Sequence, residues 1–353
     1  MSHLRYDITT HDWVIMAPER MFRPHDLKAP IENEAKGNDC PFCPENFHRH
    51  VEQADNIFEA VNPNHPDEWF IRVIKNKFPA LTPNAEKGFH ELGRHFQQYD
   101  GYGAHEVIIE SPHHLLPIAF QPVVQIELLL SILKSRYLAL SADKKLKSII
   151  LFKNHGVSAG TSLRHPHWQI IATPLVPHLL RHKHTIATEY SDRSFKCLHQ
   201  VLLKEELADG KRVILENDFF VAFNPYASPL PYQIRIMPKE FQSSFSNISN
   251  AQITALAELL KIVLGKLLML LKDPSFNLTF VSPPIGDEEE DYFQWHIDIL
   301  PRMVTLAGFE MGSGMSINPI LPEKATTEMR NQEIANSYED YLGLGIQFSP
   351  SHN

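Results

Sequence analysis

The order of the predicted helices and strands repeats along the chain, and this repeat constrains the fold more than any other feature. Short apolar runs predict strands, and apolar residues at helical spacing predict helices. The first run is strand 70–74, strand 106–110, helix 123–140, strand 148–152 and strand 168–172. The second is strand 219–223, strand 233–237, helix 251–271, strand 278–281 and strand 295–300. This order predicts an α+β fold with antiparallel sheets, because a Rossmann fold alternates strand and helix throughout.

The repeat also indicates an internal duplication. A chain of 353 residues can bury a large core and is long enough for two domains. We expect an N-terminal half at 1–185 and a C-terminal half at 195–353, each with a mostly antiparallel sheet and packed helices. Pro174, Pro177 and the basic and polar residues up to about Gln200 predict a crossover connection between the halves.

Composition excludes several classes of protein. The net charge of −9 argues against a broad nucleic-acid surface, which needs clustered Lys and Arg. The most apolar run, 259–271, contains Lys261 and Lys266 and is too short to cross a membrane. Three cysteines cannot form a disulfide framework, and the start MSHLRYDITTHDW lacks the apolar core of a signal peptide, so we expect a cytoplasmic protein. Most of the twenty histidines, such as His182 and His184, lie in polar contexts and are expected at the surface.

The stretch 154–169 reads NHGVSAGTSLRHPHWQ and carries the main chemical signal. Its Gly and Ser residues allow backbone N–H groups to approach an anion closely. Residues two apart on a strand face the same way, so His165 and His167 can lie side by side. This combination is what a phosphate site with a histidine nucleophile requires. The competing interpretation is an ordinary strand with two chance histidines.

Two shorter motifs have two interpretations each. Cys40 and Cys43 form a Cys-x2-Cys pair, which in a reducing compartment is typical of half a zinc site, although two free thiols would give the same spacing. No second Cys-x2-Cys follows, so spacing leaves the other ligands undetermined. Arg20 and Arg23 lie on a Pro-bounded loop after the predicted strand 13–16, where they could clamp a diphosphate or simply be solvated.

Six ordered motifs point to a known family. They are WVIMAPER with RP two residues later, CPFC, NKFPAL, ESPHH, NHGVSAGTSLRHPHWQ and GFEMGSG. With them, the chain resembles the galactose-1-phosphate uridylyltransferase branch of the histidine-triad superfamily, which also includes ADP-glucose phosphorylases and adenylylsulfate:phosphate adenylyltransferases. The resemblance covers nearly the whole chain. It implies two histidine-triad-like halves, the first catalytic with a zinc knuckle and the second without the His-x-His.

The resemblance implies nucleotidyl transfer through a covalent nucleotidyl-histidine. His167 matches the nucleophile, and Ser162 and Gln169 match donors to the phosphate oxygens. The matched substrate-binding residues are Arg20 and Arg23 near the nucleotide, Asn76 and Phe78 at the nucleoside, and Asn154 and Gly160 at the phosphates. Trp168 is unusual between the nucleophile and the glutamine, and on a strand it points away from both, which favours a packing role.

The same resemblance supplies a ligand set for zinc. Cys40, Cys43, His114 and His165 match a tetrahedral site, whose role is structural because four protein ligands leave no open position. Many relatives have a second metal site. The corresponding positions in this chain are Cys197, Gln200, Phe241 and Gln294, so we expect one zinc ion and no second metal.

The substrates implied are a nucleoside diphosphate sugar and a sugar phosphate or phosphate acceptor. The main prediction is a UDP-glucose:galactose-1-phosphate uridylyltransferase. The loop 308–314 is glycine-rich, whereas the best-known hexose-1-phosphate enzymes have bulkier side chains that grip the sugar. This loop keeps open an ADP-glucose phosphorylase or an adenylylsulfate:phosphate adenylyltransferase. A nucleotide hydrolase of the same fold and a zinc-stabilised scaffold are also compatible with the motifs. His296 and Asp298 are either substrate residues or core residues. Relatives also suggest a homodimer.

Overall fold

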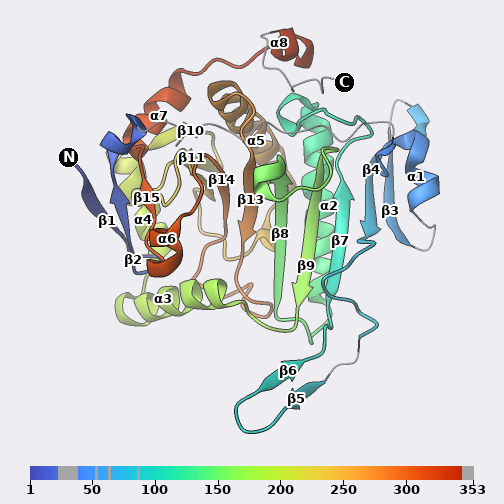
Figure 1. Cartoon of the computed structure of the whole chain (residues 1–353), viewed down its shortest axis with the longest axis horizontal. Coiled ribbons are helices and arrows are strands. Elements are labelled where there is room, and N and C mark those ends of the chain that lie inside the picture. Colours follow the sequence, from blue (N-terminus) through green and yellow to red (C-terminus); the bar gives the residue numbers. More distant parts are fainter. Residues whose placement is uncertain (23–38, 52–54, 63–64, 86–87, 344–353) are drawn as a thin grey trace.

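A ten-stranded sheet runs through the molecule, and every pairing in it is antiparallel (Figure 1). The computed structural model describes residues 1–22, 39–51, 55–62, 65–85 and 88–343. From edge to edge the strands are β10 (Val213–Glu216), β11 (Phe220–Phe223), β12 (Ile234–Pro238), β14 (His296–Pro301), β13 (Phe276–Val281), β8 (Ser148–His155), β9 (His167–Thr173), β7 (Ala104–Ile109), β4 (His65–Lys75) and β3 (Asn56–Asn62). The predicted α+β class is confirmed.

The strand order is symmetric about the centre of the sheet. From the centre outward it reads β8-β9-β7-β4-β3 on one side and β13-β14-β12-β11-β10 on the other. Helix α2 (Val123–Ser141) precedes β8, and helix α5 (Asn250–Leu271) precedes β13. The two five-stranded runs join edge to edge because β8 pairs with β13, with Asn154 opposite Asn277. The sheet is therefore continuous across the two runs.

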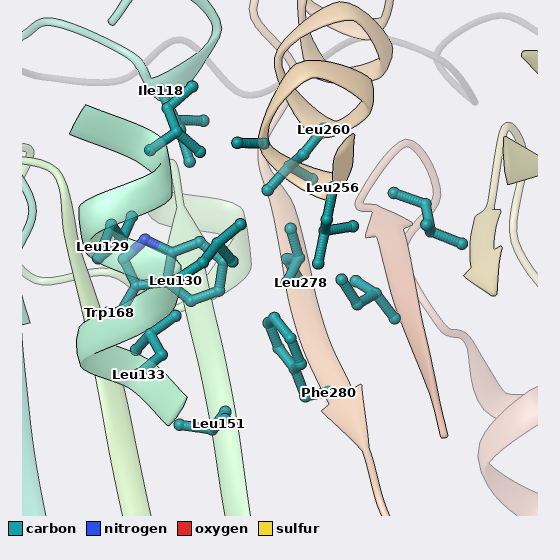
Figure 2. Close-up of a cluster of buried hydrophobic side chains, with 14 of the residues drawn as sticks. Ile118, Leu129, Leu130, Leu133, Leu151, Trp168, Leu256, Leu260, Leu278 and Phe280 are labelled. Carbon is teal, nitrogen blue, oxygen red and sulfur yellow. The ribbon is translucent and has the colours of Figure 1, made fainter. Parts of the chain in front are cut away.

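The main core lies between one face of this sheet and helices α2 and α5. Leu129 and Leu130 of α2 and Leu260 of α5 are fully buried there, together with Trp168 and Phe280 from the strands (Figure 2). Removing such side chains from water is the main favourable term in folding. Ser249 caps α5 through a capping box with Gln252, which fixes where the helix begins.

Two helices cover the other face of the second run, where the sequence indicated only a crossover connection. They are α3 (His178–Ser194) and α4 (Leu198–Asp209). Leu203 of α4 packs against Val221, Phe223 and Met237 of the sheet. His184 on α3 is 6% exposed, so the expectation that it is a surface residue was wrong. Helix α3 was missed because its residues are mostly polar and only a narrow side faces the sheet.

The remaining elements are short. Residues 308–314, expected as a loop, contain helix α6 (Gly308–Ser313), which ends at Gly314 with φ +75°. Strands β1 (His3–Asp7), β2 (Asp12–Met16) and β15 (Ile317–Asn318) form a small sheet, and β5 (Phe89–Glu91) pairs with β6 (Gln97–Tyr99) in a projecting hairpin (Figure 1). The other helices are η1 (Pro18–Phe22), α1 (Pro44–His50), η4 (Ile118–Phe120), η5 (Val157–Ala159), η6 (Phe245–Asn247), α7 (Pro322–Asn331) and α8 (Tyr338–Gly343). Within the described ranges, no helix is both long and apolar enough to span a membrane.

Candidate active site and metal centre

The two histidines of the His-Pro-His segment lie at the start of β9. Strand β9 begins at His167 and is paired with β7, where Ile109 lies opposite His167. Both imidazoles are buried, at 0% exposure for His165 and 6% for His167. The apolar run that follows them, ending near Thr173, sets this strand in the centre of the sheet and so fixes where the histidines lie.

Four side chains converge beside this strand and could hold a metal ion. They are Cys40, Cys43, His114 and His165, and their ligand atoms all lie within 4.8 Å of one another. The Nδ1 atom of His165 is 3.7 Å from Cys40 Sγ and 3.6 Å from Cys43 Sγ, and Nδ1 of His114 is 3.3 Å from Cys43 Sγ. A tetrahedral zinc ion, with Zn–S near 2.3 Å and Zn–N near 2.1 Å, places S and N atoms about 3.6 Å apart. The four residues therefore fit such an ion.

The hydrogen bonds around the cluster also suit a metal. His165 Nε2 donates to the carbonyl of Ser111 at 2.7 Å, which leaves Nδ1 unprotonated and facing the thiols. Burial and the neighbouring Cys40 raise the pKa of the Cys43 thiol to about 12. A thiolate pair is unfavourable in this site without a cation, and a bound metal reverses that preference.

The hydrogen bonding of His167 fixes which nitrogen can react. Its Nδ1 lies 2.8 Å from the carbonyl oxygen of His165, which can only accept, so Nδ1 carries the proton. The lone pair is consequently on Nε2. Burial lowers the pKa of His167 to about 4, which keeps the ring neutral near pH 7. The ring of Phe42, from the Cys-x2-Cys motif, packs edge-on against it at 5.4 Å between centroids.

The glycine-bearing turn before β9 is held from the second run of strands. Gly156 has φ +80°, and a Cβ there would lie 2.1 Å from Ser275 Oγ, so only glycine fits. Asn277 of β13 donates to Asn154 Oδ1 and to the carbonyl of Ala159, both at 2.8 Å. Gly160 has φ +87°, and a Cβ placed on it would have no other atom within 4 Å. The turn is thus fixed at its base and open at its tip.

A histidine that the sequence did not single out links two of the predicted site residues. The backbone N–H of Ala80 donates to His105 Nδ1 at 3.1 Å, so the ring proton is on Nε2. Nε2 then donates to Gln169 Oε1 at 2.8 Å, and the backbone carbonyl of His105 accepts from the backbone N–H of Asn76 at 2.9 Å. Gln169 is thereby oriented with its amide N–H groups free to donate. The period-two pattern of β7, with His105 and Val107 on one face, could have indicated this neighbour.

The other predicted substrate residues lie at more exposed positions. Phe78 is 83% exposed, and its N–H donates to Asn76 Oδ1 at 2.9 Å. Ser162 is exposed in the loop after the glycine turn. Arg20, in η1, lines a cavity of about 570 Å³ with Ser158 and residues of the α6 region, and His167 does not line that cavity. Arg23 lies outside the described residues.

The matching positions of the second run hold a different set of contacts. Gln294 precedes β14 as His165 precedes β9, and its side chain bonds to Gln200 and, at 2.6 Å, to the carbonyl of Pro238. His296 is buried, and its Nδ1 lies 3.2 Å from the Gln294 carbonyl. Asp298 forms a bidentate ion pair with Arg235, whose Nε and Nη2 atoms donate to the two carboxylate oxygens at 2.8 and 3.0 Å. His296 and Asp298 are therefore core residues beneath α3 and α4.

Comparisons of the sequence and of the structure with known proteins find the same two kinds of enzyme. The sequence profile of the family "Galactose-1-phosphate uridyl transferase, N-terminal domain" matches residues 1–177. ADP-glucose phosphorylase of Arabidopsis thaliana is 34% identical over 336 residues, with 93% of this chain and 92% of that protein covered. Galactose-1-phosphate uridylyltransferase of Thermotoga maritima is 26% identical over 343 residues, with 95% and 99% covered. The crystal structure of an Arabidopsis thaliana ADP-glucose phosphorylase with bound ADP-glucose superimposes with a TM-score of 0.80 at 32% identity, covering 95% of this chain and all of that one.

Proposed function

The chain belongs to the galactose-1-phosphate uridylyltransferase family, and from that premise we propose that it transfers a nucleotidyl group through a covalent bond to His167. The observation that supports this most directly is the ring of His167, neutral and buried, with its proton on Nδ1 and its lone pair on Nε2. In the first step Nε2 attacks the α-phosphorus of a nucleoside diphosphate sugar. The bond to the bridging oxygen breaks, and the sugar 1-phosphate leaves. In the second step a phosphate oxygen of the acceptor attacks the same phosphorus and releases the imidazole.

The proposed roles of the neighbouring residues follow their positions. Gln169 donates to a phosphate oxygen because His105 occupies its carbonyl oxygen. Asn154, Gly160 and Ser162 bind phosphate oxygens from the glycine turn, where the backbone is open. The nucleoside contacts are proposed for Asn76 and Phe78, and the contacts with the nucleotide phosphates for Arg20 and Arg23.

We propose zinc as the ion held by the knuckle, where the donor set of two thiols and two imidazoles is typical of a structural zinc site. Its ligand His165 is separated from His167 only by Pro166. Bound zinc would fasten the start of β9 to the Cys40–Cys43 turn and so hold the nucleophile's backbone. The chemistry itself is left to His167 and its neighbours.

Two pairs of substrates fit this mechanism. UDP-glucose with galactose-1-phosphate is supported by relatives such as the Thermotoga maritima enzyme at 26% identity. ADP-glucose with inorganic phosphate is supported by the higher identity, 34%, to ADP-glucose phosphorylase. Gly308 and Gly312 of α6 have open space where a side chain would lie, and this space suits the small phosphate acceptor of the second pair.

A donor-by-acceptor matrix tests the proposal. The purified protein is incubated with UDP-glucose, ADP-glucose or adenylylsulfate, each with galactose-1-phosphate or phosphate, and products are separated by chromatography. Product formed only when donor and acceptor are both present supports transfer. Nucleotide release that is independent of any acceptor would instead identify a hydrolase, and no turnover in any well would favour a scaffold.

The cellular setting is a separate proposal. We propose a cytoplasmic location, because the two buried thiols Cys40 and Cys43 are placed for a metal and need a reducing environment. A homodimer is proposed from the family resemblance alone. Light scattering of the purified protein tests the dimer, and fractionation of cells tests the compartment.

A further inference from the structure

The residue between the nucleophile and Gln169 points into the core and carries a hydrogen-bond donor there. Trp168 is fully buried against Leu129, Leu130 and Leu133 of α2 (Figure 2). Any large apolar residue would fill this space, but only an indole brings an N–H group with it. The Nε1–H of Trp168 donates to the carboxylate of Glu110, which is itself 0% exposed.

Glu110 and Ser111, which follow β7, bond to the chain on both sides of His167. Ser111 accepts from His165 Nε2 at 2.7 Å, and the N–H of Glu110 donates to the carbonyl of Pro166 at 3.3 Å. The Glu110 side chain accepts from Trp168. Residues 165, 166 and 168 are thus each tied to this one dipeptide, and His167 lies between them.

Two further groups bond to the Glu110 carboxylate, and a third bonds to its backbone carbonyl. Lys153 Nζ donates to it at 2.8 Å and Gln121 Nε2 at 3.1 Å, while Gln125 Nε2 donates to the Glu110 carbonyl at 2.7 Å. All three side chains are at most 2% exposed. A buried ion pair contributes little net stability, but a fully bonded carboxylate has one allowed position. The carboxylate that accepts the hydrogen bond from Trp168 is therefore rigid.

We infer that Glu110 and Trp168 are positioning residues that hold His167 from the core side of β9, as the knuckle holds it from the other side through His165. This inference rests on the proposed role of His167. Neither residue touches the reacting atoms. Both act through the backbone of the strand, and small displacements of a nucleophile from its attacking geometry slow the chemical step steeply.

The second run of strands offers a matched control. Trp295 lies next to His296, directly before β14, as Trp168 lies next to His167 in β9, and it is also fully buried. Its Nε1–H donates to Gln242 Oε1 at 3.0 Å. Trp295→Phe removes the same atoms as Trp168→Phe from a core of the same kind, so it measures the general cost of losing a buried indole donor.

The test compares Trp168→Phe, Trp295→Phe and the wild type in single-turnover reactions with α-labelled ADP-glucose and UDP-glucose. We expect Trp168→Phe to slow labelling of His167 about tenfold, with the donor KM within about twofold and the metal content unchanged. Trp295→Phe should label at the wild-type rate. Glu110→Gln weakens the same hydrogen bond from the acceptor side, and we expect it to lower the rate of His167 labelling about threefold. This variant provides the test if Trp168→Phe does not fold.

A second readout does not depend on activity. In protein labelled with 15N-histidine, the ring signals of His167, assigned with His167→Ala, should shift in Trp168→Phe and stay in place in Trp295→Phe. Wild-type labelling rates and ring signals in Trp168→Phe would overturn the inference. Equal losses of labelling rate in Trp168→Phe and Trp295→Phe would overturn it as well. If the wild type forms no labelled histidine, the proposed function fails, and the ring signals still decide the positioning role.

Discussion

Two histidines two positions apart differ in what their ring nitrogens face. Nδ1 of His165 faces the thiols of Cys40 and Cys43, whereas Nδ1 of His167 bonds to the backbone of its own segment. The first ring is placed to bind a metal and the second to present Nε2. The division predicts different consequences for removing each ring.

We expect His165→Ala to lose bound zinc and stability together, because one of four ligands is removed. His167→Ala should stay folded with its zinc and be inactive. Metal analysis and thermal unfolding of both variants check this. Equal loss of zinc in the two proteins would show that the assignment of the rings is wrong.

The glycine turn makes a sharper residue-level prediction. Gly156→Ala should destabilise the fold by about 2–4 kcal/mol, because it adds the strain of a positive φ to a clash with Ser275. Gly286→Ala is the matched control, with φ +108° and open space around its Cβ, and should cost only about 1 kcal/mol. Urea unfolding measures both. Equal values would mean that Ser275 moves aside at no cost.

The roles of single residues were predicted where a local pattern exposes them. Alternation along one strand placed His165 and His167 side by side, and the small-residue loop pointed to Gly156, whereas Gln169 came from the family resemblance. His105 and Asn277 were missed because their partners are 64 and 123 residues away in the chain. Separation along the chain also explains why spacing alone could not complete the metal site, and why His114 and His165 were assigned as metal ligands only through the family resemblance.

At the scale of elements, β9 and β14 occupy equivalent places in the sheet but are anchored differently. The segment before β9 meets a candidate metal site, while the segment before β14 ends in a hydrogen bond between Gln200 and Gln294. A metal is a stronger and more directional anchor than one neutral hydrogen bond. A metal bound at this site would place the more rigid anchor beside His167.

Removing the metal should therefore loosen one strand and not the other. After treatment with a chelator, amide hydrogen exchange in residues 165–169 should become at least about tenfold faster, while residues 294–298 exchange as before. Hydrogen exchange with mass spectrometry reads both segments in one sample. Uniform acceleration of the two segments would mean that the knuckle supports the whole fold rather than the start of β9.

Helices were predicted where their apolar face is wide. The spacing predicted α2 and α5 to within a residue or two because both are buried on a broad side. It missed α3, which is mostly polar, and α6, whose glycines favour a loop. The pairing of β8 with β13 could not be predicted either, since period-two patterns give the faces of strands and not their neighbours.

At the scale of the whole molecule, the buried histidines of the second run make the fold sensitive to acid. Burial lowers the pKa of His199 to about 3 and that of His184 to about 4. An unfolded histidine titrates near 6.5, so below that pH the unfolded chain binds more protons than the folded one. Stability is complete above about pH 6.5 and falls as the pH drops toward the folded values.

For His199 alone, the loss between pH 7.5 and 5 should be roughly 2 kcal/mol. His199→Phe should reduce the pH dependence of the unfolding free energy by about that amount. His178→Gln, at an exposed position, should leave it unchanged. Urea unfolding at the two pH values gives the comparison, and an unaltered slope in His199→Phe would contradict the assignment.

The whole fold combines a duplicated architecture with unequal halves. Strand β9 begins at the second histidine of a His-Pro-His segment, the matching segment before β14 reads Gln-Trp-His, and α4 packs on the second run. We propose on this basis that the division into halves at 1–185 and 195–353 is also a functional one, with chemistry confined to the first.

The proposed mechanism requires that His167 carries the nucleotidyl group. The protein is mixed with ADP-glucose or UDP-glucose without acceptor, quenched at alkaline pH, and the peptide containing residues 165–169 is weighed by mass spectrometry. We predict an added AMP or UMP on His167 in the wild type and in no sample of His167→Ala that retains its zinc. An unmodified His167 with both donors, or the same adduct in His167→Ala, would contradict the mechanism.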